Sequence, residues 1–390
     1  MTHRVYFVPG MFGFGKLAGY DYFNHMRRGI ERRFADAGLA VVCEDVPAPP
    51  TSSLRYRSRV LATTVARTAG DGDPIHLVGH STGGLDVRLV LSPSADLGIE
   101  PQLLAWRGRV ASAITMNTPH YGSPVASYFA TVSGTRVLYA LSLFTVVSLT
   151  LGEPSLAIFS RLLAGLGGID AIFGDDLKLV SRVTDGILRF VDRDGREEIS
   201  QFLGKIRGDQ GAIVQTMPEA MDLFNAATEN RKGVRYASVA TAAPPPRSLR
   251  FARRIRSPYA ALTAAMYSTL YQFAAQRHRM YPYAKPTPRQ MELLRAGIDH
   301  EISDSTSDGI VPTLSMIWGE LVWAGEADHL DIIGHFHDDG DDETEHVDWI
   351  TSGSRFTKQR FEAMLDAVVG VMLGQNAKSE AFHSRPRNVL

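Results

Sequence analysis

Strand-like apolar segments alternate with helical segments over residues 4–116, and this alternation constrains the fold more than any other feature. The expected strands are short apolar runs at residues 4–8, 39–43, 75–78 and 110–116. Segments with apolar residues at helical spacing separate them, at residues 21–37, 54–69 and 84–91. Strands and helices that alternate in this way form a parallel sheet with helices on both faces. The sequence therefore predicts an α/β fold.

The pattern changes near residue 124. Residues 137–151 are almost wholly apolar, and a second apolar helical stretch follows at 156–172. The first stretch is shorter than the ~20 residues that cross a bilayer, so a buried cap helix and a lid that opens onto lipid both remain open. We expect a core domain in two parts, interrupted by a mainly helical cap or lid that contains one core strand. The boundaries are 1–123 and 301–390 for the core, 124–300 for the insertion and 233–241 for the strand.

Composition excludes some functions. The chain of 390 residues has 41 basic and 42 acidic residues and a net charge of −1, so no global field recruits nucleic acid or acidic lipid. Cys43 is the only cysteine, which rules out an internal disulfide, and its place in an expected strand favours a buried thiol over a nucleophile. The apolar run at the N-terminus is too short for a signal peptide. The sequence predicts a cytoplasmic protein, with secretion left open if the recorded sequence is already processed.

A glycine-flanked serine follows one expected strand directly. Residues 79–83 read Gly-His-Ser-Thr-Gly between the strand at 75–78 and the helix at 84–91. This is the context of a nucleophile elbow, in which a sharp turn lifts the serine hydroxyl above an α/β-hydrolase sheet. Side chains two residues before and two after the serine would clash in such a turn, which explains the glycines. Ser81 is therefore the expected nucleophile.

A serine hydroxyl needs an adjacent base, and the base needs an orienting acid. In α/β-hydrolases the acid and then the histidine follow the serine along the chain. Asp308, in a turn, and His329 fit this order, and the apolar segment from Leu314 to Trp323 between them can supply a strand. The rivals are Asp304 for the acid and three histidines for the base; we expect His335 to lie in an exposed acidic loop. The other two histidines are His337 and His346.

Two further positions adjoin the expected nucleophile. His80 precedes it, and we expect an orienting or packing residue there rather than the base. Backbone N–H donors must stabilise the oxyanion that forms during ester cleavage. The residue after the nucleophile, Thr82, supplies one donor. A glycine-rich loop after the first strand supplies the other, with Met11 as the preferred donor and Phe12 as the alternative.

These segments together resemble the bacterial triacylglycerol lipases of the Pseudomonas/Burkholderia type and their esterase relatives. The similar segments are 79–84, 117–123, 217–225, 233–236, 307–309 and 329–331. The resemblance implies an α/β-hydrolase fold, a triad of Ser81, Asp308 and His329, and oxyanion donors at Met11 and Thr82. It also implies that Asp331 helps to bind a structural calcium ion, with a simple loop cap as the alternative. Pro9-Gly10 departs from the family pattern, which has His-Gly before the oxyanion residue.

The sequence thus predicts a carboxylic ester hydrolase of the lipase or esterase type that acts on lipid-like acyl esters and needs no cofactor for its chemistry. The same triad would also serve a polyester depolymerase, a thioesterase or an acyltransferase. A non-catalytic lipid-binding module is the alternative of another class. The apolar cap leaves open a transient contact with a membrane or lipid interface.

Overall fold

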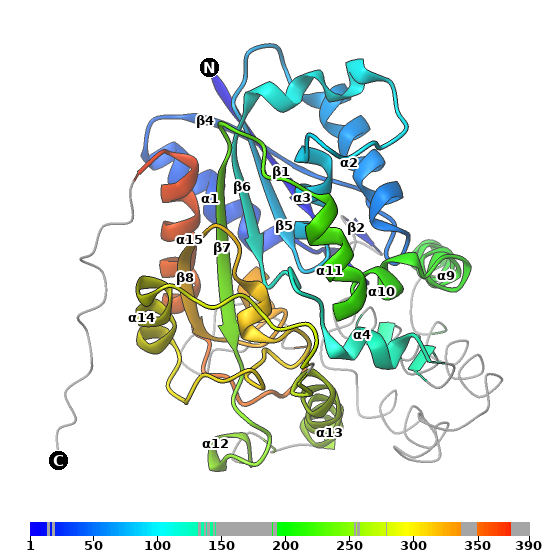
Figure 1. Cartoon of the computed structure of the whole chain (residues 1–390), viewed down its shortest axis with the longest axis vertical. Coiled ribbons are helices and arrows are strands. Elements are labelled where there is room, and N and C mark those ends of the chain that lie inside the picture. The colour runs from blue at the N-terminus through cyan, green and yellow to red at the C-terminus, as the bar shows by residue number, and fades with distance from the viewer. Residues whose placement is uncertain are drawn as a thin grey trace.

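Six parallel strands form the centre of the computed structural model. It describes residues 1–13, 16–17, 20–131, 193–252, 258–277, 279–336 and 349–375, with isolated positions at 134–135, 138, 141–142, 145, 189 and 255. The strand order is β4-β1-β5-β6-β7-β8, and every pairing is parallel (Figure 1). The bounds are Ala40–Asp45 for β4, Thr2–Val8 for β1, Ile75–His80 for β5, Val110–Met116 for β6, Arg235–Ala242 for β7 and Glu320–Glu326 for β8. A short antiparallel pair, β2 (Lys16–Leu17) and β3 (Tyr20–Asp21), lies outside this sheet.

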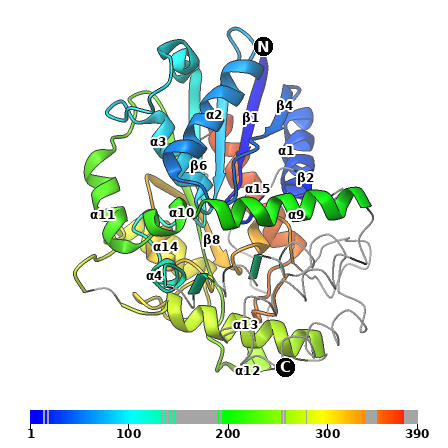
Figure 2. The same cartoon turned by 90° about the vertical axis from the view of Figure 1, so that its right-hand side faces the viewer.

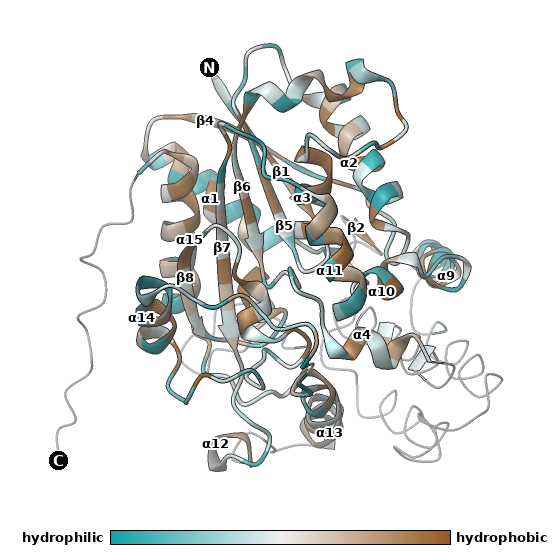
Figure 3. Cartoon of the chain, viewed as in Figure 1, coloured by the Kyte–Doolittle hydropathy of each residue, from teal (hydrophilic) through white to brown (hydrophobic). Residues whose placement is uncertain are grey.

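Helices cover both faces of the sheet (Figure 2). Helices α1 (Asn24–Asp36) and α15 (Lys358–Met372) pack on one face, and α2 (Leu54–Thr68) and α3 (Gly83–Leu91) on the other. The side chains of β1 alternate between the two cores, as the pleat of a strand requires: Val5 and Phe7 lie in the first, Tyr6 and Val8 in the second. Figure 3 shows α3, which is buried along nearly its whole length, as mainly apolar. The predicted α/β fold is confirmed.

The remaining described elements surround this core. The helices are α4 (Pro124–Phe129), α9 (Arg193–Gly208), α10 (Gly211–Gln215), α11 (Pro218–Ala227), α12 (Leu249–Ala252), α13 (Pro258–Ala274) and α14 (Pro288–Gly297), and the 3₁₀ segments are η1 (Pro101–Arg109), η2 (Thr313–Met316) and η3 (Asp331–Ile333). None of the helices in the described part of the chain combines the length and apolar character needed to cross a membrane. Most of 137–151 and all of 156–172 fall outside the described residues, so the cap or lid and its boundaries stay predictions.

The order of the strands locates a crevice. The chain places β4 on one side of β1 and then β5 on the other, so the connections leave β1 and β5 in opposite directions. Ligands of open α/β sheets bind at such a switch point, beyond the carboxyl ends of the strands. Val8, the last residue of β1, pairs in register with Gly79, the residue before the end of β5. The loops that follow these two strands are therefore neighbours.

Two expectations need correction. The strand expected from Leu314 to Trp323 is divided, because the chain turns at Gly319 (φ +68°), where a Cβ would lie 2.4 Å from the carbonyl oxygen of Tyr236; η2 precedes the turn and β8 follows it. Cys43 is only half-buried, because β4 is an edge strand. Partial burial still raises the pKa of its thiol to about 12. The strand expected at 233–241 is confirmed as β7.

Candidate active site

Ser81 occupies a strained turn at the end of β5. Its φ is +53°, a left-handed value that non-glycine residues adopt at a cost of about 1–3 kcal/mol. A Cβ on Gly79 would lie 2.5 Å from the backbone of Gly83 and Gly84, and one on Gly83 would lie 2.1 Å from the carbonyl oxygen of Val8. The glycines two before and two after the serine are therefore required by close backbone approach, as the sequence predicts. The turn places the Ser81 hydroxyl at the carboxyl end of the sheet.

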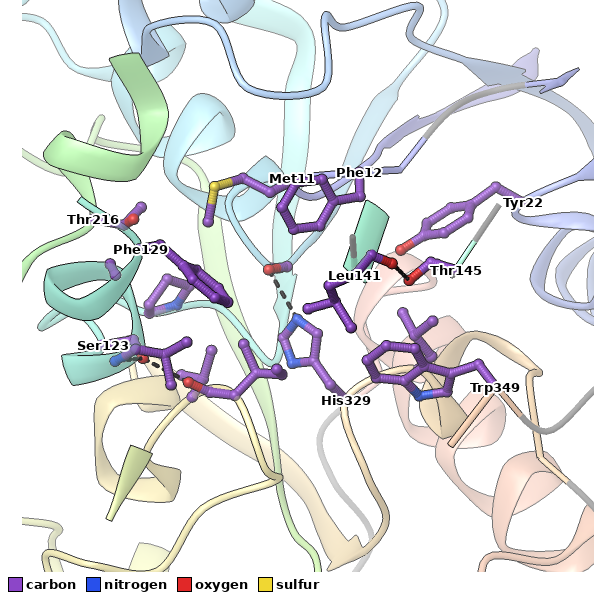
Figure 4. A pocket seen from close by; sticks show the side chains of 17 residues that line it. Met11, Phe12, Tyr22, Ser123, Phe129, Leu141, Thr145, Thr216, His329 and Trp349 are labelled. Atoms are coloured by element: carbon purple, nitrogen blue, oxygen red, sulfur yellow. Dashed lines mark hydrogen bonds between the residues drawn. The ribbon is translucent and has the colours of Figure 1, made fainter. Parts of the chain in front are cut away.

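His329 and Asp308 form a hydrogen-bonded line with this serine. Nε2 of His329 lies 3.0 Å from the Ser81 Oγ, an interaction drawn as a dashed line at His329 in Figure 4. Its Nδ1 lies 2.6 Å from Oδ2 of Asp308. All three side chains are buried or nearly so, with Asp308 1% exposed. Because an ionised carboxylate only accepts hydrogen bonds, Nδ1 carries the imidazole proton. The lone pair of Nε2 is then left facing the serine hydroxyl.

The turn after Ser307 holds the Asp308 carboxylate in place. Its Oδ1 accepts hydrogen bonds from the backbone N–H groups of Ile310 and Val311, both at 2.8 Å. Gly309 makes the turn possible with a φ of +99°. With Oδ1 engaged by the backbone, Oδ2 alone faces His329, so the orientation of the carboxylate is fixed.

The loop after β1 passes close beside the serine. Gly10 approaches so closely that a Cβ there would lie 2.5 Å from the Ser81 Cβ. The N–H of Phe12 is engaged, donating to the Pro50 carbonyl at 3.3 Å. The backbone N–H groups of Met11 and Thr82 donate no hydrogen bond to any residue in the described part of the chain. Of the two donors that the sequence left open for this loop, the geometry therefore favours Met11.

Arg57, on α2, holds the loop after β1 in place through a hydrogen bond. The sequence did not predict this role for Arg57. Its side chain is fully buried; Nη2 donates to the Pro9 carbonyl at 2.5 Å, and Nη1 donates to the Pro49 carbonyl. Nε donates to Asp86 of α3 at 2.8 Å. Burial raises the pKa of the Asp86 carboxyl to about 7, against the opposing charge of Arg57. One sequence signal exists: Arg57 lies on the apolar face of the helix, where a cation must find partners.

The rival residues lie elsewhere. The side chain of Asp304 is 55% exposed and pairs with Arg277 at 3.6 Å. His335 is fully buried, so the expected exposed loop position is wrong; its Nδ1 meets the hydroxyl of Tyr20 at 2.7 Å. The acidic run that suggested exposure begins only after His335. His337 and His346 fall outside the described residues.

The surroundings of Asp331 bear on the implied calcium ion. Its Oδ2 accepts hydrogen bonds from the backbone N–H of Asp328 at 2.8 Å and the hydroxyl of Ser354 at 2.6 Å. In the described part of the chain, no three His, Cys, Asp or Glu side chains are grouped to hold a metal ion. Calcium takes six or more oxygen ligands, more than the described residues are shown to group here, so the calcium ion stays a prediction. The hydrogen bond from Asp328 ties Asp331 to the loop that carries His329.

A mainly apolar pocket opens above the serine. It encloses about 670 Å³, part of which is open to solvent. Figure 4 shows His329 between two groups of wall residues, with Phe129 and Thr216 on one side and Tyr22 and Trp349 on the other. The sequence did not predict these wall residues, because they come from distant segments and share no motif. The pocket suits an apolar chain attached to a group that reaches Ser81.

Comparison with known proteins finds similar chains among lipases and esterases. No family model matches the chain. A triacylglycerol lipase from Vibrio cholerae serotype O1 is 31% identical over 190 residues, which are 48% of this chain and 53% of that lipase. The aligned region thus spans about half the length of this curated relative.

Solved structures share the fold. Lipase 1 from Pelosinus fermentans superposes with a TM-score of 0.52 and 15% identity, covering 94% of this chain and 98% of the lipase. EstA from Clostridium botulinum gives 0.51 and 15%, covering 94% and 88%. A metagenomic carboxyl esterase gives 0.50 and 16%, covering 95% and 76%. The chain has the α/β-hydrolase fold, and its predicted resemblance to lipases and esterases is confirmed, whereas the closer resemblance to the Pseudomonas/Burkholderia type stays a prediction.

Proposed function

We propose that this protein is a serine hydrolase that cleaves carboxylic esters with lipid-like acyl chains. One observation carries the proposal: the hydrogen-bonded line from the Ser81 Oγ through His329 to Asp308, at 3.0 Å and 2.6 Å. A serine beside a base that is itself oriented by an acid is the general arrangement of an activated nucleophile. The likeness to a triacylglycerol lipase supports the same activity.

In the first half of the proposed reaction, Ser81 takes up the acyl group. Nε2 of His329 removes the hydroxyl proton as Oγ forms a bond to the ester carbonyl carbon, and the carbonyl electron pair moves onto its oxygen. The N–H groups of Met11 and Thr82 stabilise that oxyanion. When the tetrahedral intermediate collapses, the bond to the alcohol oxygen breaks and His329 returns the proton to it. Asp308 stabilises the imidazolium that exists between these two transfers.

In the second half, water takes the place of the alcohol. His329 removes a proton from water while its oxygen attacks the acyl carbon, and the same N–H pair stabilises the second oxyanion. Collapse breaks the bond to Oγ, which regains its proton from His329, and the carboxylic acid leaves. The protein supplies every proton carrier in this cycle, so no cofactor is needed for the chemistry.

The walls of the pocket support an apolar acyl group. Phe129, Trp349 and Val311 are among the lining residues, and the few polar groups include Ser81 and His329 themselves. An apolar chain that enters this pocket gains about 25 cal/mol for each Å² removed from water. We therefore expect catalytic efficiency to rise with acyl-chain length until the chain fills the pocket.

The test is hydrolysis of p-nitrophenyl esters with short, medium and long acyl chains. We expect kcat/KM to rise about fourfold per added methylene, from about 0.8 kcal/mol for each buried CH₂, and then to level off. In parallel, a fluorophosphonate should label the protein, and peptide mapping should find the label on Ser81. An inactive protein that also resists the label would contradict the proposal.

The Arg57 contacts lead to a separate prediction. Arg57→Met leaves Asp86 buried without its cation, which should lower the free energy of unfolding by about 3–5 kcal/mol. It also releases the Pro9 carbonyl, so the loop that presents the Met11 N–H should shift and kcat should fall by up to about 10²-fold. Urea unfolding and ester hydrolysis measure the two effects.

The double variant Arg57→Met with Asp86→Leu separates stability from positioning. Removing both charges should restore most of the stability, since no unpaired buried charge remains. It should not restore kcat, because the Pro9 carbonyl still lacks its donor. Recovery of both stability and kcat in the double variant would show that Arg57 does not position the loop.

A further inference from the structure

The ring of His80 lies beside the ring of the proposed base, His329, and the proposed reaction gives His80 no role. It is the last residue of β5 and immediately precedes Ser81, with a side chain 1% exposed. Its ring lies 4.9 Å from the ring of His329, centroid to centroid. Its Nε2 lies 2.9 Å from the backbone carbonyl oxygen of His329. The residue next to the nucleophile is thus bonded to the main chain of the base.

The hydrogen-bond partners of His80 determine which of its ring nitrogens carries the proton. A carbonyl oxygen can only accept, so Nε2 carries the hydrogen and donates to His329. Burial, and then the charge of His329, hold the pKa of His80 well below its usual range, so the ring stays neutral. Nδ1 is therefore an acceptor, and the hydroxyl of Tyr22 donates to it at 3.1 Å. Burial raises the pKa of the Tyr22 phenol, which keeps that donor protonated.

Tyr22 is held in turn by a second pair of the same kind. Nε2 of His335 lies 3.3 Å from the backbone carbonyl oxygen of Tyr22, and Nδ1 of His335 lies 2.7 Å from the hydroxyl of Tyr20. Because the Tyr22 carbonyl oxygen can only accept, His335 donates to it from Nε2. Two tyrosine–histidine pairs thus form a series that ends on the His329 carbonyl.

We infer that His80 is a positioning residue that holds the main chain of His329, and that the hydrogen bond from Tyr22 holds the ring of His80 in the orientation this requires. The inference rests on the proposed function, because it concerns the distance between the hydroxyl of Ser81 and Nε2 of His329. Among the described hydrogen bonds, the one from His80 is the only one to the His329 carbonyl. Neighbouring contacts in this loop go to Leu330 and Asp331 instead. A neutral His80 also avoids repelling the imidazolium that His329 becomes during the reaction.

The experiment compares two substitutions of His80. His80→Leu keeps an apolar side chain of similar size but removes the donor, so kcat should fall by about 10²-fold. KM should stay within about threefold, because uniform substrate binding is untouched. His80→Gln places an amide N–H₂ near the position of Nε2 and should recover kcat to within about tenfold of wild type. Equal losses in both variants would assign His80 to packing and overturn the inference.

Tyr22→Phe tests the second part without removing a ring. It deletes one hydroxyl from a side chain that lines the pocket, so the aromatic ring stays in the pocket wall and Nδ1 of His80 loses its hydrogen-bond donor. We expect kcat to fall by about 2- to 10-fold, the range for one lost hydrogen bond, with KM unchanged. If His80→Leu does not fold, this variant and His80→Gln carry the test. A wild-type kcat in Tyr22→Phe would overturn the role of Tyr22.

His76 provides the matched control. It lies on the same strand, is fully buried, and bonds through Nδ1 to the hydroxyl of Ser112 at 2.8 Å, at the opposite end of β5. His76→Leu should lower stability but leave kcat within about twofold of wild type. A wild type without esterase activity, or activity that survives Ser81→Ala, contradicts the proposed function itself. An active wild type with unchanged kcat in folded His80→Leu contradicts only the inference.

Discussion

Ser81→Ala should lower kcat for ester hydrolysis by about 10⁶-fold, the largest loss expected from any single substitution in this chain. The variant removes the hydroxyl oxygen that lies 3.0 Å from Nε2 of His329, so no acyl-enzyme can form. A residual rate about 10³–10⁴-fold above that in water should remain, because the oxyanion donors and the pocket are intact. Binding of a slowly cleaved long-chain ester should be nearly unchanged. The measurement is kcat on the best p-nitrophenyl ester, with binding followed separately.

Ser112→Ala is the matched control for this substitution. Ser112 is also buried, but it lies on β6 and bonds to His76 near the opposite ends of these two strands. Its loss should cost stability and leave kcat unchanged. Ser81→Ala protein that retains substantial hydrolysis, or that still reacts with a fluorophosphonate, would place the nucleophile elsewhere.

Asp308→Asn should lower kcat by about 10⁴-fold at neutral pH, by imposing the wrong tautomer on the base. The reason is specific to this turn. The backbone N–H groups of Ile310 and Val311 point at Oδ1, so the amide oxygen must occupy that place and the NH₂ must face His329. Nδ1 then has to accept, the imidazole proton moves to Nε2, and the lone pair that should receive the Ser81 proton is gone. The fold should survive, because both backbone bonds are kept.

Asp304→Asn is the control, since this residue is four positions away, exposed, and paired only with Arg277 among the ionic contacts described. It should leave kcat unchanged. The tautomer itself can be read from the ¹⁵N chemical shifts of the His329 ring, which should exchange between Nδ1 and Nε2 in the variant. An Asp308→Asn protein with wild-type kcat would remove Asp308 from the mechanism.

The strands and the serine turn could be predicted because their signals are local. Alternating apolar segments specify β1, β4, β5 and β6 from a few residues each, and the glycine pattern around Ser81 lies within the short segment 79–83. The pairing of Asp308 with His329 followed from chain order, and the structure brings these two side chains into contact. Their catalytic roles stay predictions until kinetics test them.

The other features depend on tertiary contacts that no short window contains. Arg57 belongs to an ordinary helix by its neighbours, and only the fold reveals the Pro9 carbonyl that it binds. His335 precedes an acidic run, which suggests exposure, yet packing against Tyr20 and Tyr22 buries it completely. Trp349 reaches the pocket from a segment far from any motif. Burial and long-range hydrogen bonds thus account for what the sequence reading missed.

The hydrogen bond between Ser81 and His329 joins positions 248 residues apart, and this distance has a consequence for the timing of activity during synthesis. At ordinary translation rates of about 5–20 residues per second, the histidine leaves the ribosome about 12–50 s after the serine. Strands β1, β5 and β6 and the serine turn can assemble in that interval, whereas the segments that supply the acid and the base do not yet exist. We therefore expect the nascent chain to carry a hydroxyl that no base has yet activated, and a product truncated before β8 to lack hydrolytic activity because His329 is missing.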